Sequence, residues 1–166
     1  MTFETRQANV DDVEDIADAH RDSIQSLGPA SYPPDVVAQW ADGLNGDVYR
    51  DAMKRGEVFF IAIGRLDGQQ RVLGFASDYI IEAAKHGISA YVRGRVARCG
   101  VGTRLLQLAE AHAVARGATS IDIEASLAAV EFYNRNGFIE LARGTTTLRT
   151  GHPIACVFMR KELTRG

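Results

Sequence analysis

The segment from residue 91 to residue 105 constrains the fold of this chain more than any other part. It has the pattern of a strand that runs into a loop, and the loop leads into the clearest helical pattern of the chain, expected over residues 100–116. Gly100 and Gly102 leave the backbone bare where this helix begins. Because free amides and the positive end of the helix dipole meet there, the segment predicts an anion site, and a pyrophosphate suits it.

Cationic side chains gather at the same place, although the chain as a whole is slightly acidic. Its 19 Lys and Arg residues against 21 Asp and Glu residues give a formal net charge of −2, so no global positive field would concentrate nucleic acid. The twelve residues 93–104 contain no acid and four arginines, namely Arg93, Arg95, Arg98 and Arg104. We expect these arginines to serve the phosphates of a cofactor, and we expect no nucleic-acid partner.

The length and composition are typical of one soluble domain, spanning residues 1–166. No apolar run approaches the roughly 20 residues that cross a bilayer, and the first ten residues lack the apolar core of a signal peptide. Two cysteines are too few for a disulfide framework or a structural zinc site. We therefore expect a cytoplasmic protein with no membrane partner and no metal.

Hydrophobic periodicity predicts an α/β protein with a mixed sheet and helices on both faces, because a βαβ unit lies in its centre. Strands are expected over residues 2–8, 58–63, 72–76, 87–92, 120–124, 138–142 and 154–160. Helices are expected over residues 9–27, 34–40, 47–54, 100–116 and 127–135.

Several kinds of loop compete for the segment that opens the central helix. A P-loop needs Lys and Ser/Thr after its second glycine, whereas Thr103 and Arg104 follow Gly102. A dinucleotide fingerprint needs a third glycine where Leu105 stands, although Asp122 lies at the spacing of a ribose-binding acid. A plain strand-to-helix turn without a ligand is a further alternative.

Another kind of loop matches better. Residues 97–102 resemble motif A of the GCN5-related N-acetyltransferases, Arg/Gln-x-x-Gly-x-Gly/Ala, with Ala97 departing from the first position and Arg98 beside it able to supply charge. Residues 121–138 are similar to the family's motif B, whose helix carries x-F-Y-x-x-x-G-F, and residues 5–12 look like its first strand and helix cap. The three segments stand in the family's order and together extend over most of the chain.

The resemblance implies the acyl-CoA N-acyltransferase fold, in which the mixed sheet splays between its fourth and fifth strands. It also implies acetyl-CoA as cosubstrate and direct transfer of the acetyl group to a primary amine of a small molecule, an amino-acid derivative or a peptide. The pantetheine would bind backbone groups of the fourth strand, at Ala90, Tyr91 and Val92. The pyrophosphate would bind the amides of Arg98, Cys99, Gly100, Val101, Gly102 and Thr103.

The resemblance assigns Tyr133 to the family's general-acid position. A phenol with a reference pKa near 10 stays protonated at neutral pH and can donate to the leaving thiolate. The alternative is that Tyr133, like Phe132, only fills the core. Cys99 is expected to contribute its amide rather than a nucleophilic thiol, and Cys156 to be a small core residue.

The general base stays open at this point. Alkylamines have pKa values near 10, so most of the acceptor arrives as ammonium and must lose a proton. We place His86 in this role because its reference pKa suits a base near pH 7, with a solvated turn residue as the alternative. Glu82, Asp78, Glu124 and a chain of water molecules are the other candidates.

Two other functions compete with acetyl transfer: a non-catalytic module that senses acyl-CoA, and a nucleotide-dependent oxidoreductase. The acceptor is not identified by the sequence. In the family, the region that here holds His20, Tyr32 and Trp40 walls the acceptor site, and residues 143–152 are expected to border the same cleft. An exposed sheet edge would offer a route to a homodimer.

Overall fold

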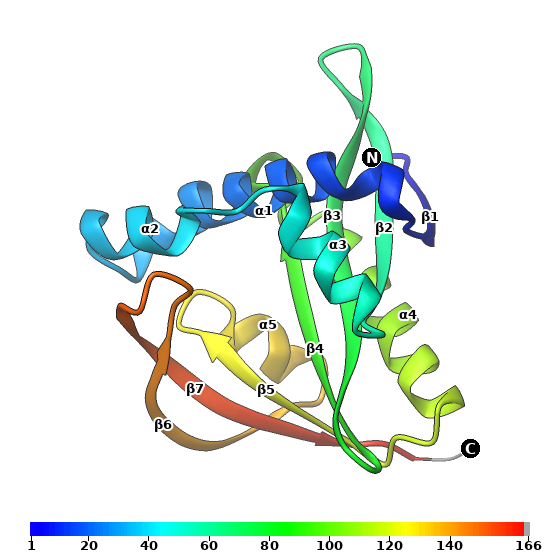
Figure 1. The fold of residues 1–166 in the computed structure, drawn as a ribbon, viewed down its shortest axis with the longest axis vertical. Coiled ribbons are helices and arrows are strands. Elements are labelled where there is room, and N and C mark those ends of the chain that lie inside the picture. Colours follow the sequence, from blue (N-terminus) through cyan, green and yellow to red (C-terminus); the bar gives the residue numbers. More distant parts are fainter. Residues whose placement is uncertain (165–166) are drawn as a thin grey trace.

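The computed structural model describes residues 1–164, which form one seven-stranded sheet covered by helices (Figure 1). The strand order in the sheet is β1-β2-β3-β4-β5-β7-β6. The strands are β1 (Glu4–Gln7), β2 (Val58–Leu66), β3 (Gln69–Glu82), β4 (Lys85–Val92), β5 (Ser120–Ser126), β6 (Ile139–Thr147) and β7 (Pro153–Glu162). Neighbouring strands are antiparallel except β4 and β5, which are parallel because helix α4 (Val101–Ala115) connects them.

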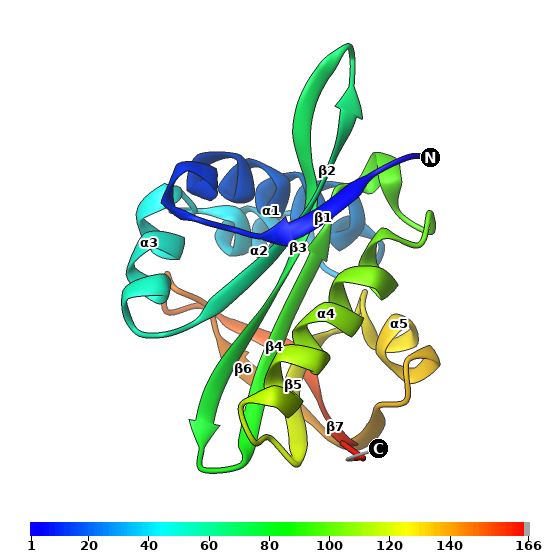
Figure 2. The ribbon, with the colours of Figure 1, turned by 90° about the vertical axis from the view of Figure 1, so that its right-hand side faces the viewer.

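Helices cover both faces of this sheet, as Figure 2 shows, with α1 to α3 on one side and α4 and α5 on the other. The helices are α1 (Val13–Leu27), α2 (Pro34–Ala41), α3 (Gly46–Lys54), α4 (Val101–Ala115) and α5 (Val130–Arg135). The predicted mixed sheet with helices on both faces is confirmed. None of the helices in residues 1–164 has both the length and the apolar character that crossing a membrane requires.

Each face of the sheet has its own apolar core, because side chains alternate between the faces along a strand. On one face, Ile16 of α1 packs with Phe59 and Phe75. On the other, Leu105 of α4 packs with Ile88 of β4 and with the neighbouring strand β5. These two cores hold β4 firmly from both sides, which fixes the position of the loop that follows it.

The parallel pair at the centre of the sheet is very short. Strands β4 and β5 pair only at Lys85 with Ser120 and at His86 with Ile121. Beyond these two pairs the strands diverge (Figure 1), so the β4 edge from residue 87 onward has no β5 partner in the sheet. The splay between the fourth and fifth strands that the resemblance implied is confirmed.

The hairpin of β3 and β4 is longer than the periodicity predicts. The strand expected over residues 72–76 is part of β3, which has 14 residues. The strand expected over residues 87–92 is β4, which begins two residues earlier, at Lys85. The alternation of apolar and polar residues does not predict this extension of β3, because Ser77 and Asp78 are polar yet fully buried. The alternative interpretation of His86 as a solvated turn residue is wrong, since His86 is a buried residue of β4.

Candidate active site

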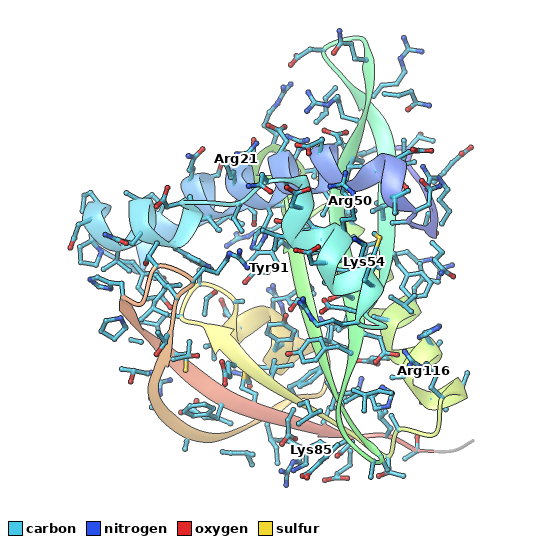
Figure 3. The ribbon with its side chains drawn as sticks, in the orientation of Figure 1. Arg21, Arg50, Lys54, Lys85, Tyr91 and Arg116 are labelled. Carbon is cyan, nitrogen blue, oxygen red and sulfur yellow. The ribbon has the colours of Figure 1, made fainter. Side chains whose placement is uncertain are left out.

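A cavity of about 240 Å³ lies where β4 and β5 diverge. Residues of both strands line it, and α2, α5 and the β6–β7 hairpin complete its wall. Four of the five tyrosines of the chain reach this cavity: Tyr32, Tyr79, Tyr91 and Tyr133. Figure 3 shows Tyr91 beneath α1, beside β4.

The loop between β4 and α4 has the backbone of an anion site. Both Arg98 (φ +63°) and Gly100 (φ +84°) adopt the left-handed conformation just before α4 begins. Left-handed residues in such a turn direct successive amides to one side, and the dipole of α4 adds positive potential. Gly102 also packs closely, because a Cβ there would lie 3.1 Å from the Phe132 ring and 3.4 Å from the Val92 side chain, so a larger residue would press these side chains aside.

The arginines around this loop divide into two pairs. Arg93 is buried and bonds to acids of α1, and Arg95 pairs with Asp67 at the tip of the β2–β3 hairpin. Arg98 and Arg104, by contrast, are exposed, and their guanidinium groups make no hydrogen bond or ion pair with another side chain or with the backbone in residues 1–164. Only this second pair is available to a bound anion.

Tyr133 reaches the cavity from α5 and is almost fully buried, at 5% exposure. Its hydroxyl lies near the backbone amide of Ala90, on the β4 side of the cavity. Burial, together with Tyr91 and Tyr79 nearby, raises the pKa of Tyr133 well above its usual value near 10. The phenol therefore stays protonated at physiological pH, as a proton donor must.

Glu124 of β5 is the only acidic side chain on the cavity wall in residues 1–164. The hydroxyl of Thr146 donates a hydrogen bond of 2.7 Å to one oxygen of its carboxylate. Such a bond orients the side chain while the second carboxylate oxygen keeps its acceptor capacity. This arrangement can hold an ammonium group and take a proton from it.

Tyr79 is a site residue that no sequence pattern predicted, because it lies in the part of β3 beyond the expected strand. Its ring crosses Gly87 of β4, where any Cβ would overlap the ring. Burial raises the pKa of Tyr79 to about 12, and the carboxylates of Glu57 and Glu124 contribute to this shift. Glycine opposite tyrosine in a strand pair is the signal in the sequence, but it becomes visible only once the register is known.

His86 lies outside the cavity lining. Its Nδ1 is 2.6 Å from Asp78, and the other oxygen of Asp78 is 2.8 Å from Nδ1 of His112 on α4. Figure 3 shows Lys85 and Arg116, which border this group, well below Tyr91. Glu82 is 71% exposed and pairs with Lys85. Of the four predicted candidates for the base, the structure brings only Glu124 to the cavity.

Aromatic rings form the wall opposite β5. The Trp40 ring lies edge-on to the rings of Tyr32 and Tyr91, at 5.6 and 6.2 Å between centroids. The Tyr32 hydroxyl donates to the carbonyl of Ala155 at 2.7 Å and accepts from the amide of Leu127 at 2.8 Å. Because these ring contacts and the two hydrogen bonds of the Tyr32 hydroxyl fix the side chains, the rings present a preorganised aromatic surface.

His20 supports this wall from behind and does not line the cavity. Its ring lies 3.9 Å from that of Tyr91 between centroids, and its Nδ1 is 2.7 Å from the Tyr49 hydroxyl. Burial lowers the pKa of His20 to about 3. The folded protein therefore keeps His20 neutral at a pH where the unfolded chain protonates it.

This difference predicts a loss of stability in acid. Protonation of unfolded His20 below its reference pKa of about 6.5 favours unfolding, and the penalty grows until the pH reaches about 3. At pH 5 it amounts to about 2 kcal/mol. We expect His20→Gln to lose less stability than the wild type between pH 7 and pH 5, measured by urea unfolding at both values. Equal losses in the two proteins would contradict the prediction.

The splayed sheet, the amide-lined loop at α4 and the cavity between β4 and β5 define the acyl-CoA N-acyltransferase fold. The family comparison agrees: the sequence model described as "Acetyltransferase (GNAT) family" matches residues 17–138, more than half of the chain. The protein belongs to this family of acetyltransferases.

Solved structures with the same fold span nearly the whole chain. A GCN5-related N-acetyltransferase from Rhodopseudomonas palustris is 28% identical, with a TM-score of 0.81 over 98% of this chain and 97% of that one. PaiA N-acetyltransferase from Thermoplasma acidophilum, in complex with coenzyme A, is 20% identical, with a TM-score of 0.78 over 98% and 100%. A phosphinothricin acetyltransferase from Sinorhizobium meliloti, in complex with acetyl-CoA, is 19% identical, with a TM-score of 0.70 over 100% and 91%. The comparison with curated proteins found no match.

Proposed function

We propose that this protein is an N-acetyltransferase that moves the acetyl group of acetyl-CoA directly to a primary amine of a small molecule or peptide. The observation that carries the proposal is the cavity at the β4–β5 splay, which has the amide-lined loop near one end and both Tyr133 and Glu124 on its wall. The coenzyme complexes of the two structural neighbours with the same fold support the choice of donor.

The donor is placed by backbone groups rather than by side chains. The pantetheine would bind the β4 edge that β5 leaves unpaired, at Ala90, Tyr91 and Val92. The pyrophosphate would bind the amides of residues 98–103, with the free guanidinium groups of Arg98 and Arg104 beside it. This placement directs the thioester into the cavity, towards Tyr133.

The side chains of the cavity supply the proton transfers. The carboxylate of Glu124 takes a proton from the acceptor ammonium, directly or through water, and the neutral amine attacks the thioester carbonyl. A backbone amide near Val92 stabilises the oxyanion. Tyr133 then donates its proton to the leaving thiolate, and the second proton that the nitrogen of the adduct loses restores the phenol. His86 has no part in this scheme, because it faces Asp78 rather than the cavity.

Two measurements on the purified protein test the proposal. Calorimetry should detect binding of acetyl-CoA and not of NADH, and a panel of primary amines should release free thiol from acetyl-CoA at a rate that depends on the amine. Binding of NADH alone would favour the oxidoreductase. Binding of acetyl-CoA without thiol release for any amine would favour the acyl-CoA sensor.

A further inference from the structure

The cavity wall carries an unusual balance of charge for a site that binds amines. Among the residues of the described chain that line it, Glu124 is the only charged one, and there is no Lys, Arg or His. An acceptor with a carboxylate would therefore bring its anion next to Glu124 with no cation to receive it. Like charges brought within a few ångströms of each other repel.

Two arginines, one on α1 and one in the β6–β7 loop, lie outside the cavity lining. Arg21 donates to the carbonyl of Leu44 and pairs with Asp18. Arg149 lines a separate hollow of about 260 Å³ over α3, together with the acids Asp47 and Asp51. Neither arginine lines the cavity, so neither is placed to receive a carboxylate bound there.

A second carboxylate strengthens the negative potential behind the wall. Glu57 accepts a hydrogen bond of 2.6 Å from the Ser77 hydroxyl and, with Glu124, acts electrostatically on Tyr79. Glu57 does not line the cavity. The field at the Tyr79 hydroxyl therefore favours a cation, but the cavity itself offers a salt bridge to only one ammonium group.

The rest of the wall suits an uncharged body. The ring of Trp40 lies edge-on to Tyr32 and to Tyr91, at 5.6 and 6.2 Å between centroids. Aromatic faces of this kind pack against apolar or aromatic groups and attract a neighbouring ammonium group. Ammonium recognition by Glu124 and apolar recognition by the rings thus occur on the same wall.

We infer that the acceptor is a primary monoamine with an apolar or aromatic body and no carboxylate, held by Glu124 through its ammonium group and by Tyr32, Trp40 and Tyr91 through its body. The inference rests on the proposed acetyl transfer and narrows it. A free amino acid is excluded by its carboxylate, and a diamine lacks a second anion on the wall.

Three matched acceptors test the inference in the thiol-release assay. Phenethylamine has no α-substituent, phenylalaninamide has a neutral one, and phenylalanine has a negative one of nearly the same size. We expect the kcat/KM values of phenethylamine and phenylalaninamide to exceed that of phenylalanine at least tenfold. We expect putrescine to be at least tenfold poorer than phenethylamine.

A pair of charge variants on the β6–β7 hairpin provides the control. Thr147 lines the cavity and Thr150 does not, and both are exposed. We expect Thr147→Lys to lower the preference for phenylalaninamide over phenylalanine at least fivefold, and Thr150→Lys to leave it unchanged. A wild-type preference for phenylalanine or putrescine, or equal ratios in the two variants, would overturn the inference while acetyl transfer stands. No thiol release with any acceptor would overturn the proposed function and the inference with it.

Discussion

Replacement of Tyr133 by phenylalanine is expected to lower kcat for acetyl transfer about a hundredfold. The substitution removes one hydroxyl from a buried ring that meets Phe132 and Phe138 at 5.2 Å between centroids, so the packing of α5 should persist. The expected loss lies at the lower end of the usual range for general acid catalysis, because a thiolate with a pKa of about 8.5 leaves moderately well without a proton.

The effect should appear in kcat, while the affinity for coenzyme A stays within twofold of the wild type, measured by calorimetry. Tyr32→Phe is the matched control, since it removes another hydroxyl of the same cavity that bonds only to backbone groups of Ala155 and Leu127. We expect Tyr32→Phe to keep most of kcat. An unchanged kcat in Tyr133→Phe, or an equal loss in the control, would contradict the assignment of the proton donor.

The central βαβ unit was predictable because its signals are local. The continuous apolar pattern of α4 and the glycines before it depend on neighbouring residues alone, and the structure has a helix at Val101–Ala115. The cap of residue 9 was predictable for the same reason: Asn9 caps the 3-10 turn Val10–Asp12 that leads into α1, and it accepts a hydrogen bond of 2.9 Å from the amide of Asp11. The splay followed from the family resemblance, not from periodicity.

The composition of the site was less predictable, because it depends on pairs that are distant in the sequence. His86 was a reasonable candidate for the base by its reference pKa, yet β3 brings Asp78 to it and buries both side chains completely. Tyr79 reaches the cavity only because Gly87 lies opposite it. No local pattern reveals such a contact before the strand register is known.

The four arginines of residues 93–104 also show that contacts between residues distant in the sequence are not predicted by local patterns. Sequence proximity assigned Arg93, Arg95, Arg98 and Arg104 to one anion site. The strand that ends at Val92 instead directs Arg93 towards α1, where it meets Asp15 and Asp18. Arg93 is thus a structural residue, and its removal should affect the fold before it affects any ligand.

Replacement of Arg93 by methionine is expected to destabilise the protein by about 3 kcal/mol, a typical loss when one partner of a buried ion pair is removed. The guanidinium group of Arg93 donates to the carbonyl of Val72 at 2.6 Å and to Asp18 and Asp15 at 2.7 and 3.0 Å. The substitution leaves that carbonyl without its side-chain donor. The value lies at the lower end of the range because both acids are partly exposed and keep Arg71 as a partner.

Urea unfolding at pH 7 measures this loss, and Arg95→Met is the matched control two residues further along the chain. Arg95 pairs with Asp67, and the two side chains are 59% and 78% exposed, so the solvent screens their attraction and the unfolding midpoint should not move. Equal midpoints for the two variants would show that the bonds of Arg93 to α1 do not stabilise the fold. A lower midpoint for Arg93→Met alone would show that the bonds of this buried guanidinium group to α1 and to Val72 of β3 stabilise the fold. The position of α1, which packs behind the acceptor wall, would then depend on Arg93.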